Sequence, residues 1–193
     1  MDDTLETSRT TYESPLGSLL LVAGPGGLRT IAFPGHSEPV AETTRDNGSA
    51  VIADETGGGG SAVLAESIRQ LDEYFAGTRR QFDLPLDLGD QGTPFQRRVW
   101  TELAQIPFGA TTSYGNVARA IGRLDRIRAV GGAVGRVPVP IVVPCHRVIG
   151  SDGDLVGYGG GLHRKRALLE LEARVSGNDP LPALWSARQL AML

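Results

Sequence analysis

The stretch TPFQRRVWTELAQIPFG, residues 93–109, decides the fold of the second half of the chain. Thr93 is a favourable N-cap, Pro94 suits the first position of a helix, and Gln96 completes a capping box. Apolar residues then recur at the spacing of one helix face, at Phe95, Val99, Leu103 and Ile106. The stretch therefore predicts an amphipathic helix that ends at its final Pro-Phe-Gly.

Downstream of this helix the sequence indicates a helix-turn-helix or winged-helix module. A short helix is expected over Tyr114–Ile121, followed by the glycine-rich, basic RIRAVGGAVGR, residues 126–136. The apolar run Ile141–Val143 is expected to form a buried strand. A last helix is expected over Leu162–Arg174.

The N-terminal part is expected to combine strands with one helix. Ser18–Ala23 and Leu28–Phe33 are apolar runs separated by the turn cluster Gly-Pro-Gly-Gly, which predicts a hairpin. Residues 35–60 have no sustained period and are expected to be a flexible, acidic loop. From Ser61 the period becomes helical, and residues 81–92 are expected to be an extended linker, because proline disfavours a central strand. The helix presents Leu64, Ile68, Leu71 and Phe75 on one face.

These elements predict an α+β protein with domains at 1–92 and 93–175 and a tail of unknown role at 176–193. The 193 residues can bury one or two small cores. A single cysteine cannot form an internal disulfide, which favours a reducing, cytoplasmic compartment. No run approaches the roughly 18 apolar residues of a membrane span, and the polar start MDDTLETSRT does not resemble a secretory signal. Three histidines and one cysteine are too few to indicate a zinc site.

Charge is divided unevenly along the chain. Residues 1–92 hold 6 basic and 15 acidic residues, whereas residues 93–175 hold 12 basic and 6 acidic residues. A basic half on an acidic chain is typical of a protein that binds a polyanion such as DNA. A solvated basic surface explains the charge equally well.

The only cysteine lies in IVVPCHRVIG, residues 141–150. A lone Cys145 can be a small buried hydrophobic residue or a nucleophile. Pro144 and His146 favour the nucleophile, since the thiol would lie at a strand end beside a base that a water molecule could connect to it. Glu172 falls on the apolar side of the last helix, where it either orients the histidine or reaches water at the helix end.

The segment 126–136 is expected to form a helix despite three glycines, each of which costs roughly 1 kcal/mol relative to alanine. Such a thin helix can approach another helix or the floor of a DNA groove, and its arginines favour DNA. GYGGGL, residues 157–162, lacks the third glycine of a dinucleotide-binding loop. A loop that closes on a flat ligand is the better interpretation.

Taken together, TPFQRRVW, TSYGNVARAIG, RAVGGA, PCHRVIG and GYGGGLHRKRALLELE resemble the successive motifs of the O6-alkylguanine-DNA alkyltransferases, also called methylated-DNA–protein-cysteine methyltransferases. The match covers about residues 93–174, and SPLGSLLLVAGPGGL is similar to the family's N-terminal hairpin. The resemblance implies a ribonuclease-H-like N-terminal domain and a winged-helix-type C-terminal domain. It also implies a single-turnover DNA repair enzyme that needs no cofactor or metal and moves the alkyl group of O6-alkylguanine to its own cysteine, with O4-alkylthymine as a further candidate substrate.

The resemblance also implies roles for individual residues. Cys145 would be the nucleophile, His146 would take its proton through a water, Glu172 would orient His146, and Tyr114 would donate to guanine N3. The DNA would be bound through its minor groove, with the damaged base flipped out and the protein monomeric in solution or clustering on DNA. The DNA-binding residues would be Arg126, Arg128, Ala129, Gly132 and Arg136, with Arg128 filling the gap in the duplex. The base pocket would be lined by Pro140, Val148, Tyr158 and Gly159.

One departure from the family concerns Val137, which stands where the family usually has asparagine. That asparagine resembles a hinge between the recognition helix and the cysteine loop, and valine has no hydrogen-bonding side chain. Two other functions compete with the alkyltransferase: a non-enzymatic protein that binds alkylguanine lesions, and a winged-helix transcription factor. Relatives of the first kind usually replace the cysteine, and the second needs no Cys-His pair beside a distant glutamate.

Overall fold

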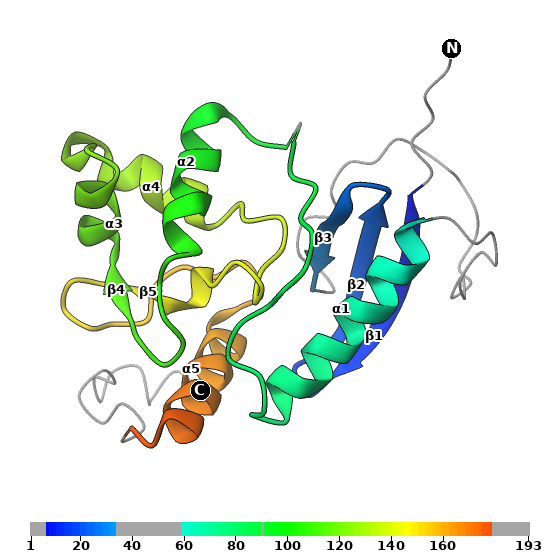
Figure 1. The fold of residues 1–193 in the computed structure, drawn as a ribbon. Coiled ribbons are helices and arrows are strands. Elements are labelled where there is room, and N and C mark those ends of the chain that lie inside the picture. The colour runs from blue at the N-terminus through cyan, green and yellow to red at the C-terminus, as the bar shows by residue number, and fades with distance from the viewer. Residues whose placement is uncertain (1–6, 34–58, 90, 179–193) are drawn as a thin grey trace, which may run out of the picture. The chain divides into compact units, whose positions relative to one another are not determined.

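The structure is a computed structural model that describes residues 7–33, 59–89 and 91–178 (Figure 1). The expected acidic loop at 35–60 lies outside the described residues except for its last two glycines, and so does the tail from residue 179. The chain divides into two compact units, Met1–Asp90 and Gln91–Leu193. Both units contain helices and strands, so the predicted α+β class is confirmed.

The first unit is a three-stranded antiparallel sheet with one helix along it (Figure 1). The strands are β1 (Ser8–Ser14), β2 (Gly17–Gly24) and β3 (Gly27–Ala32), in the order β1-β2-β3. The predicted hairpin of β2 and β3 is confirmed. The apolar pattern did not predict β1, because its only buried residue is Tyr12.

Helix α1 (Gly59–Phe75) covers the sheet and begins two residues before the predicted start at Ser61. Its buried face contains Leu64, Leu71 and Tyr74, but also the polar side chain of Gln70, which is 1 % exposed. A buried amide needs hydrogen-bond partners, and Gln70 finds them in the segment that follows the helix.

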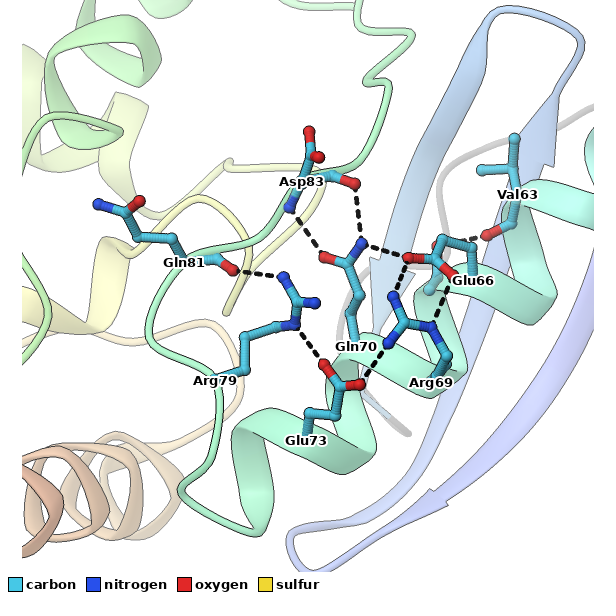
Figure 2. Close-up of polar contacts among 9 residues, drawn as sticks. Val63, Glu66, Arg69, Gln70, Glu73, Arg79, Gln81 and Asp83 are labelled. Atoms are coloured by element: carbon cyan, nitrogen blue, oxygen red, sulfur yellow. Dashed lines mark hydrogen bonds and ion pairs between the residues drawn. The ribbon is translucent and has the colours of Figure 1, made fainter.

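That segment contains the predicted extended linker, and three sets of contacts hold it to the helix and the sheet of the first unit. Gln70 donates to the carbonyl oxygen of Asp83 and accepts from its amide, each at 2.8 Å (Figure 2). Arg79 reaches back to Glu73 at 2.7 Å, and Glu73 also pairs with Arg69 (Figure 2). The amide of Leu28 in β3 then donates to the carbonyl of Pro85 at 2.8 Å. Proline is tolerated here because it lies at the edge of the sheet.

The second unit begins with α2 (Pro94–Leu103), whose Thr93–Gln96 capping box is present as predicted. The short strand β4 (Thr112–Ser113) leads into α3 (Tyr114–Ala120), and the 3₁₀ turn η1 (Leu124–Arg126) leads into α4 (Ile127–Val134). Helices α2, α3 and α4 pack on one another (Figure 1), which confirms the predicted helix-turn-helix. Trp100 of α2 donates through its indole Nε1 to the carbonyl of Ala133 in α4 at 2.9 Å.

The rest of the second unit carries the cysteine. The 3₁₀ turn η2 (Cys145–Arg147) is followed by β5 (Val148–Ile149), which pairs in parallel with β4. Helix α5 (Leu162–Ser176) closes the unit and contacts η2. It extends two residues beyond the predicted end at Arg174 and stops at a left-handed Gly177.

The predicted strand at Ile141–Val143 is wrong. These residues form a tight turn, in which Val143 donates to the carbonyl of Val139 at 2.9 Å and Ile141 has a φ of 76°. Pro140 and Pro144 lack amide donors, so a regular strand ladder cannot continue through them. The apolar run reflects burial alone, since Ile141 is 0 % exposed and Val143 is 3 % exposed.

Candidate active site

Cys145 is the first residue of the turn η2 and is 4 % exposed. Its amide donates to the carbonyl of Val143 at 2.7 Å, so the backbone before it is already folded tightly. The pairing of β5 with β4 brings the segment after the cysteine next to the start of α3. Tyr114, the first residue of α3, lies close enough to Cys145 for the two groups to interact electrostatically.

His146 and Glu172 form a fully buried pair. His146 Nε2 lies 2.8 Å from Glu172 Oε1, and the two side chains are 0 % and 1 % exposed. Burial lowers the pKa of His146 more than the adjacent carboxylate raises it, so the imidazole is neutral. Burial alone would raise the pKa of Glu172, but hydrogen bonds from His146 and Arg147 outweigh it and hold that pKa well below its usual range. The helix position of Glu172 on the apolar face is confirmed.

Arg147 is a site residue that the sequence analysis missed. Its Nε and Nη2 atoms donate to both oxygens of Glu172 at 2.8–3.2 Å, and its Nη1 donates to the carbonyl of Ile106 at 2.6 Å. Its guanidinium carbon also lies 5.7 Å from the centroid of the Phe108 ring. Arginine after a Cys-His pair gave no signal by itself, because an arginine in a basic half is usually solvated.

The turn after α2 supplies one more donor to Glu172. The amide of Gly109 donates to Glu172 Oε2 at 2.9 Å. Gly109 has a φ of +75°, and a Cβ there would lie 2.2 Å from Ser176 Oγ, so only glycine fits this approach to α5. The helix was expected to end at Pro107-Phe108-Gly109, but α2 already ends at Leu103. The Pro-Phe-Gly instead lies in the turn after the helix and is part of the site.

Lys165 is the second residue that was missed, although it is the only lysine in the chain. It is 0 % exposed and has no carboxylate partner among the described residues. Its Nζ donates to the carbonyl oxygens of Val148 and Val156 at 2.5 and 2.7 Å and lies 5.9 Å from the centroid of the Tyr114 ring. Burial lowers the pKa of Lys165 to about 8, and the nearby Cys145 acts in the opposite direction. One lysine among so many arginines was the available signal.

The thiol of Cys145 is neutral at rest. Burial raises its pKa to about 12, against the charge of Lys165 and the backbone hydrogen bonds at Cys145 and His146, all of which favour the thiolate. A nearby base must therefore take the proton before the sulfur can react. His146 Nδ1 is the candidate, because it is buried and has no hydrogen-bond partner among the described residues.

The predicted tyrosines surround the cysteine. The Tyr114 hydroxyl donates to the carbonyl oxygen of Val156 at 3.0 Å, and burial together with Cys145 raises its pKa to about 12. Burial and Cys145 also raise the pKa of Tyr158 well above its ordinary value, and its hydroxyl is buried. Among the other predicted pocket residues, Val148 is buried, and Pro140 and Gly159 are half-buried.

The predicted DNA-binding residues lie on α4 and at its ends. Arg126, Arg128, Ala129 and Arg136 are exposed, and Gly132 is half-buried. A Cβ at Gly132 would meet, within 4 Å, only Arg136 Nη1 at 3.4 Å. The packing of the described chain therefore does not explain why this position has no side chain.

No group of three or more His, Cys, Asp or Glu side chains among the described residues is arranged to hold a metal ion. No described helix is long and apolar enough to cross a membrane.

Both halves of the chain match models of known protein families. The model of the ribonuclease-like domain of 6-O-methylguanine DNA methyltransferase matches residues 8–88, and the model of its DNA binding domain matches residues 94–174. These matches confirm the expected resemblance and the expected ribonuclease-like and DNA-binding parts.

Individual relatives agree along nearly the whole chain. The methylated-DNA–protein-cysteine methyltransferase of Mycobacterium leprae is 46 % identical over 162 residues, covering 84 % of this chain and 90 % of the relative. The constitutive enzyme of that name from Bacillus subtilis is 39 % identical over 167 residues, covering 86 % and 95 %. The crystal structure of Mycobacterium tuberculosis OGT in complex with DNA is 42 % identical, with a TM-score of 0.72 and coverage of 86 % and 93 %. The chain therefore belongs to the methylated-DNA–protein-cysteine methyltransferase family.

Proposed function

We propose that this chain repairs O6-alkylguanine in double-stranded DNA by transferring the alkyl group to Sγ of Cys145. Family membership supplies the reaction class, a methyl transfer to a protein cysteine. The observation that carries the assignment of the residues is the arrangement around the thiol. Cys145 directly precedes His146, which is a neutral, buried imidazole with one nitrogen on Glu172 and the other without a partner among the described residues.

The reaction is a displacement in which His146 acts as the base. A water molecule between the thiol and His146 Nδ1 carries the proton from Sγ to the imidazole. The sulfur then forms a bond to the alkyl carbon while the bond from that carbon to guanine O6 breaks. The electron pair stays on the guanine, and the hydroxyl of Tyr114 donates to guanine N3 as the negative charge develops. The thioether is stable, so each molecule reacts once and the steps require no cofactor.

Lys165 supports the sulfur electrostatically. A positive charge near a buried thiolate offsets part of the cost of moving that charge out of water. Lys165 is suited to this role because its ammonium group donates hydrogen bonds to three main-chain carbonyl oxygens. No carboxylate among the described residues neutralises its charge. The effect acts before the attack, when the thiolate carries its full charge.

Tyr114 must exchange hydrogen-bond partners when the base enters. Its hydroxyl now donates to the carbonyl oxygen of Val156, and Lys165 donates to the same oxygen. When Tyr114 turns to the base, this carbonyl keeps its lysine donor and is not left unsatisfied. The exchange therefore costs less than breaking a sole hydrogen bond.

Helix α4 is proposed to bind the minor groove. The exposed arginines on the helix and at its ends attract phosphates. Arg128 has no hydrogen bond or ion pair among the described residues, so it is available to fill the gap left by a flipped base. Gly132 allows the helix to approach the groove floor closely. Flipping costs a few kcal/mol, and less for a base whose pairing is already weakened by alkylation.

The protein is proposed to act as a monomer in the cytoplasm, where the free thiol stays reduced. A non-enzymatic lesion-binding protein would share the α4 surface. It would not need the buried His146–Glu172 pair behind a retained cysteine, which is why the alkyltransferase is preferred.

The experiment that tests the function weighs the intact protein after incubation with a duplex that carries O6-methylguanine. A gain of one methyl group on the peptide that contains Cys145 is the expected result. Binding of the methylated duplex without a change in mass would instead support the lesion-binding protein. A duplex with unmodified guanine is the matched control and should leave the mass unchanged.

A further inference from the structure

Arg147 makes contacts that neither the nucleophile nor the base requires directly. Its side chain is 8 % exposed and has three nitrogen atoms engaged at once, on Glu172 and on Ile106. Burying a guanidinium is costly unless every contact is satisfied. A buried guanidinium two residues after the reacting cysteine therefore suggests that Arg147 has a role in the reaction.

The donors around Glu172 determine how it can bond to His146. Arg147 donates through Nε and Nη2, and Gly109 donates through its amide. A guanidinium and an amide can only donate, so the carboxylate accepts on both oxygens and is ionised. An ionised carboxylate has no proton to give, and the 2.8 Å contact therefore requires His146 Nε2 to carry the hydrogen.

The proton on Nε2 leaves Nδ1 of the neutral ring with the lone pair. Nδ1 is also the atom that is buried and has no hydrogen-bond partner among the described residues. The donor count around Glu172 and the unpartnered nitrogen are independent observations, and both place the base at Nδ1.

Arg147 is itself fixed from the other side. Its Nη1 donates to the carbonyl of Ile106 at 2.6 Å, and the Phe108 ring lies against the guanidinium at 5.7 Å. Both residues belong to the turn after α2, which also supplies Gly109. The planar fork of arginine matches this arrangement, whereas a lysine could supply the charge but only a single point of contact.

We propose that Arg147 is a positioning residue for alkyl transfer, which keeps Glu172 an ionised acceptor and thereby places the proton of neutral His146 on Nε2 and the base on Nδ1. The inference rests on the proposed transfer to Cys145. It adds that the turn Ile106–Gly109 sets the protonation of the base through Arg147, although this turn does not touch the thiol in the contacts described above.

Loss of the guanidinium changes the charges that face His146. These are Glu172 and Lys165 from α5 and Arg147 from η2, with the thiol of Cys145 adjacent. Without Arg147, the carboxylate is the unbalanced charge, and it would hold a proton on His146 to higher pH. A protonated imidazole cannot accept the thiol proton, so transfer would slow on the acid side of neutrality.

The first experiment follows the ring nitrogens of His146 by ¹⁵N NMR in the full chain, without DNA. The wild type should show the neutral form protonated at Nε2 across neutral pH. Arg147→Met should titrate at a higher pH than the wild type, and Arg147→Lys should lie between them. An unchanged titration and tautomer in folded Arg147→Met would overturn the proposal, because Arg147 would then be only a packing residue. The three histidines of the chain keep the spectrum simple, and His146→Gln assigns the signal.

The second experiment measures single-turnover methyl transfer across the same pH range. In Arg147→Met the acid limb of the rate profile should move to higher pH, giving about a tenfold loss at a pH one unit below the shifted midpoint. Arg69→Met is the matched control, because Arg69 pairs with two glutamates on the exposed side of α1 in the first unit. A profile that keeps its shape while the rate falls uniformly would count against the proposal.

A double variant covers the case in which Arg147→Met does not fold. Arg147→Met with Glu172→Gln removes both charges, so no unpaired charge stays buried. It should fold and remain slow, because glutamine does not force one tautomer on His146. Recovery of the wild-type rate would overturn the proposal. If the wild-type protein gains no methyl group, the proposed function fails, but the NMR experiment still tests Arg147.

Discussion

Two regions of the second unit hold basic residues in opposite ways. Around Cys145, Arg147 and Lys165 are buried and every nitrogen contact reaches a carboxylate, a carbonyl or an aromatic ring. Arg126, just before α4, and Arg128, in its first turn, are exposed and make few contacts. Buried, hydrogen-bonded charges can act on the reacting groups, which have fixed positions. Exposed charges without fixed contacts are suited to binding DNA. Substitutions in the first region should therefore change the rate of transfer, and substitutions in the second should change the affinity for DNA.

The largest effect is expected from Cys145→Ala, which removes the nucleophile. Methyl uptake from the O6-methylguanine duplex should be abolished, while binding of that duplex, measured by fluorescence anisotropy, should stay within about twofold of the wild type. The thiol is small and alanine fills most of its space, so the fold should survive. Loss of binding as well as transfer would mean that Cys145 is structural and that the two regions are not separable.

Glu172→Gln should follow, since it removes the acceptor that fixes His146. General base catalysis contributes about a hundredfold to ten-thousandfold to a rate, and we expect a loss of about a thousandfold in single-turnover transfer. Affinity for the duplex should not change. An equal loss in affinity would contradict the separation between the site and the α4 surface.

The same substitution should also lower stability in a pH-dependent way. Removing one member of a buried ion pair costs about 3 kcal/mol, because Arg147 is left unpaired. The pKa of Glu172 is depressed in the folded protein, so its contribution is complete above the unfolded value near 4.3 and is lost as the pH falls below it. Urea unfolding at pH 7 should therefore separate the variant from the wild type, and the gap should shrink below about pH 4. A gap that is constant from pH 7 to pH 3 would argue against an ionised Glu172.

Arg128→Ala tests the second region. Affinity for the methylated duplex should fall about tenfold, since a side chain that contacts DNA contributes about 1–3 kcal/mol. Transfer at saturating protein should change much less, because the thiol and its base are untouched. Arg69→Ala, an exposed arginine of the first unit, is the control and should bind DNA normally. A rate defect at saturation without a change in affinity would place Arg128 in the chemical step.

The smallest expected effect is a gain. Val137 is half-buried between α4 and the cysteine loop, and its side chain offers no hydrogen bond where the family usually has asparagine. Val137→Asn should speed transfer by up to about fivefold, as a hydrogen bond contributes about 1 kcal/mol net. Single-turnover rates at saturating protein measure this directly. An unchanged rate would show that another group already ties the two regions together.

The sequence predicted those features whose causes are local. The capping box at Thr93–Gln96 and the hairpin of β2 and β3 depend on residues within a few positions of each other, and both are confirmed. The strand expected at Ile141–Val143 failed because burial and strand structure produce the same apolar run. Pro140 and Pro144 exclude the strand, because they lack the amide hydrogens that a strand ladder needs.

The site was predicted only where spacing carried the information. Glu172 was found because a carboxylate on an apolar helix face stands out. Arg147 and Lys165 were not, because their partners are carbonyls and a carboxylate contributed by other segments, such as Ile106 and Val156. A main-chain carbonyl has no sequence signature, so contacts of this kind require the folded structure.

The site contains the single thiol of the chain and its single lysine amine, and both are buried. A maleimide reports on Cys145 alone. An amine-directed label, once the N-terminus has reacted, reports on Lys165 alone. The rate at which each label enters the native protein measures how often that part of the site opens to solvent. The ratio of the two rates distinguishes a local movement of the loop at Val156 from unfolding of the whole second unit.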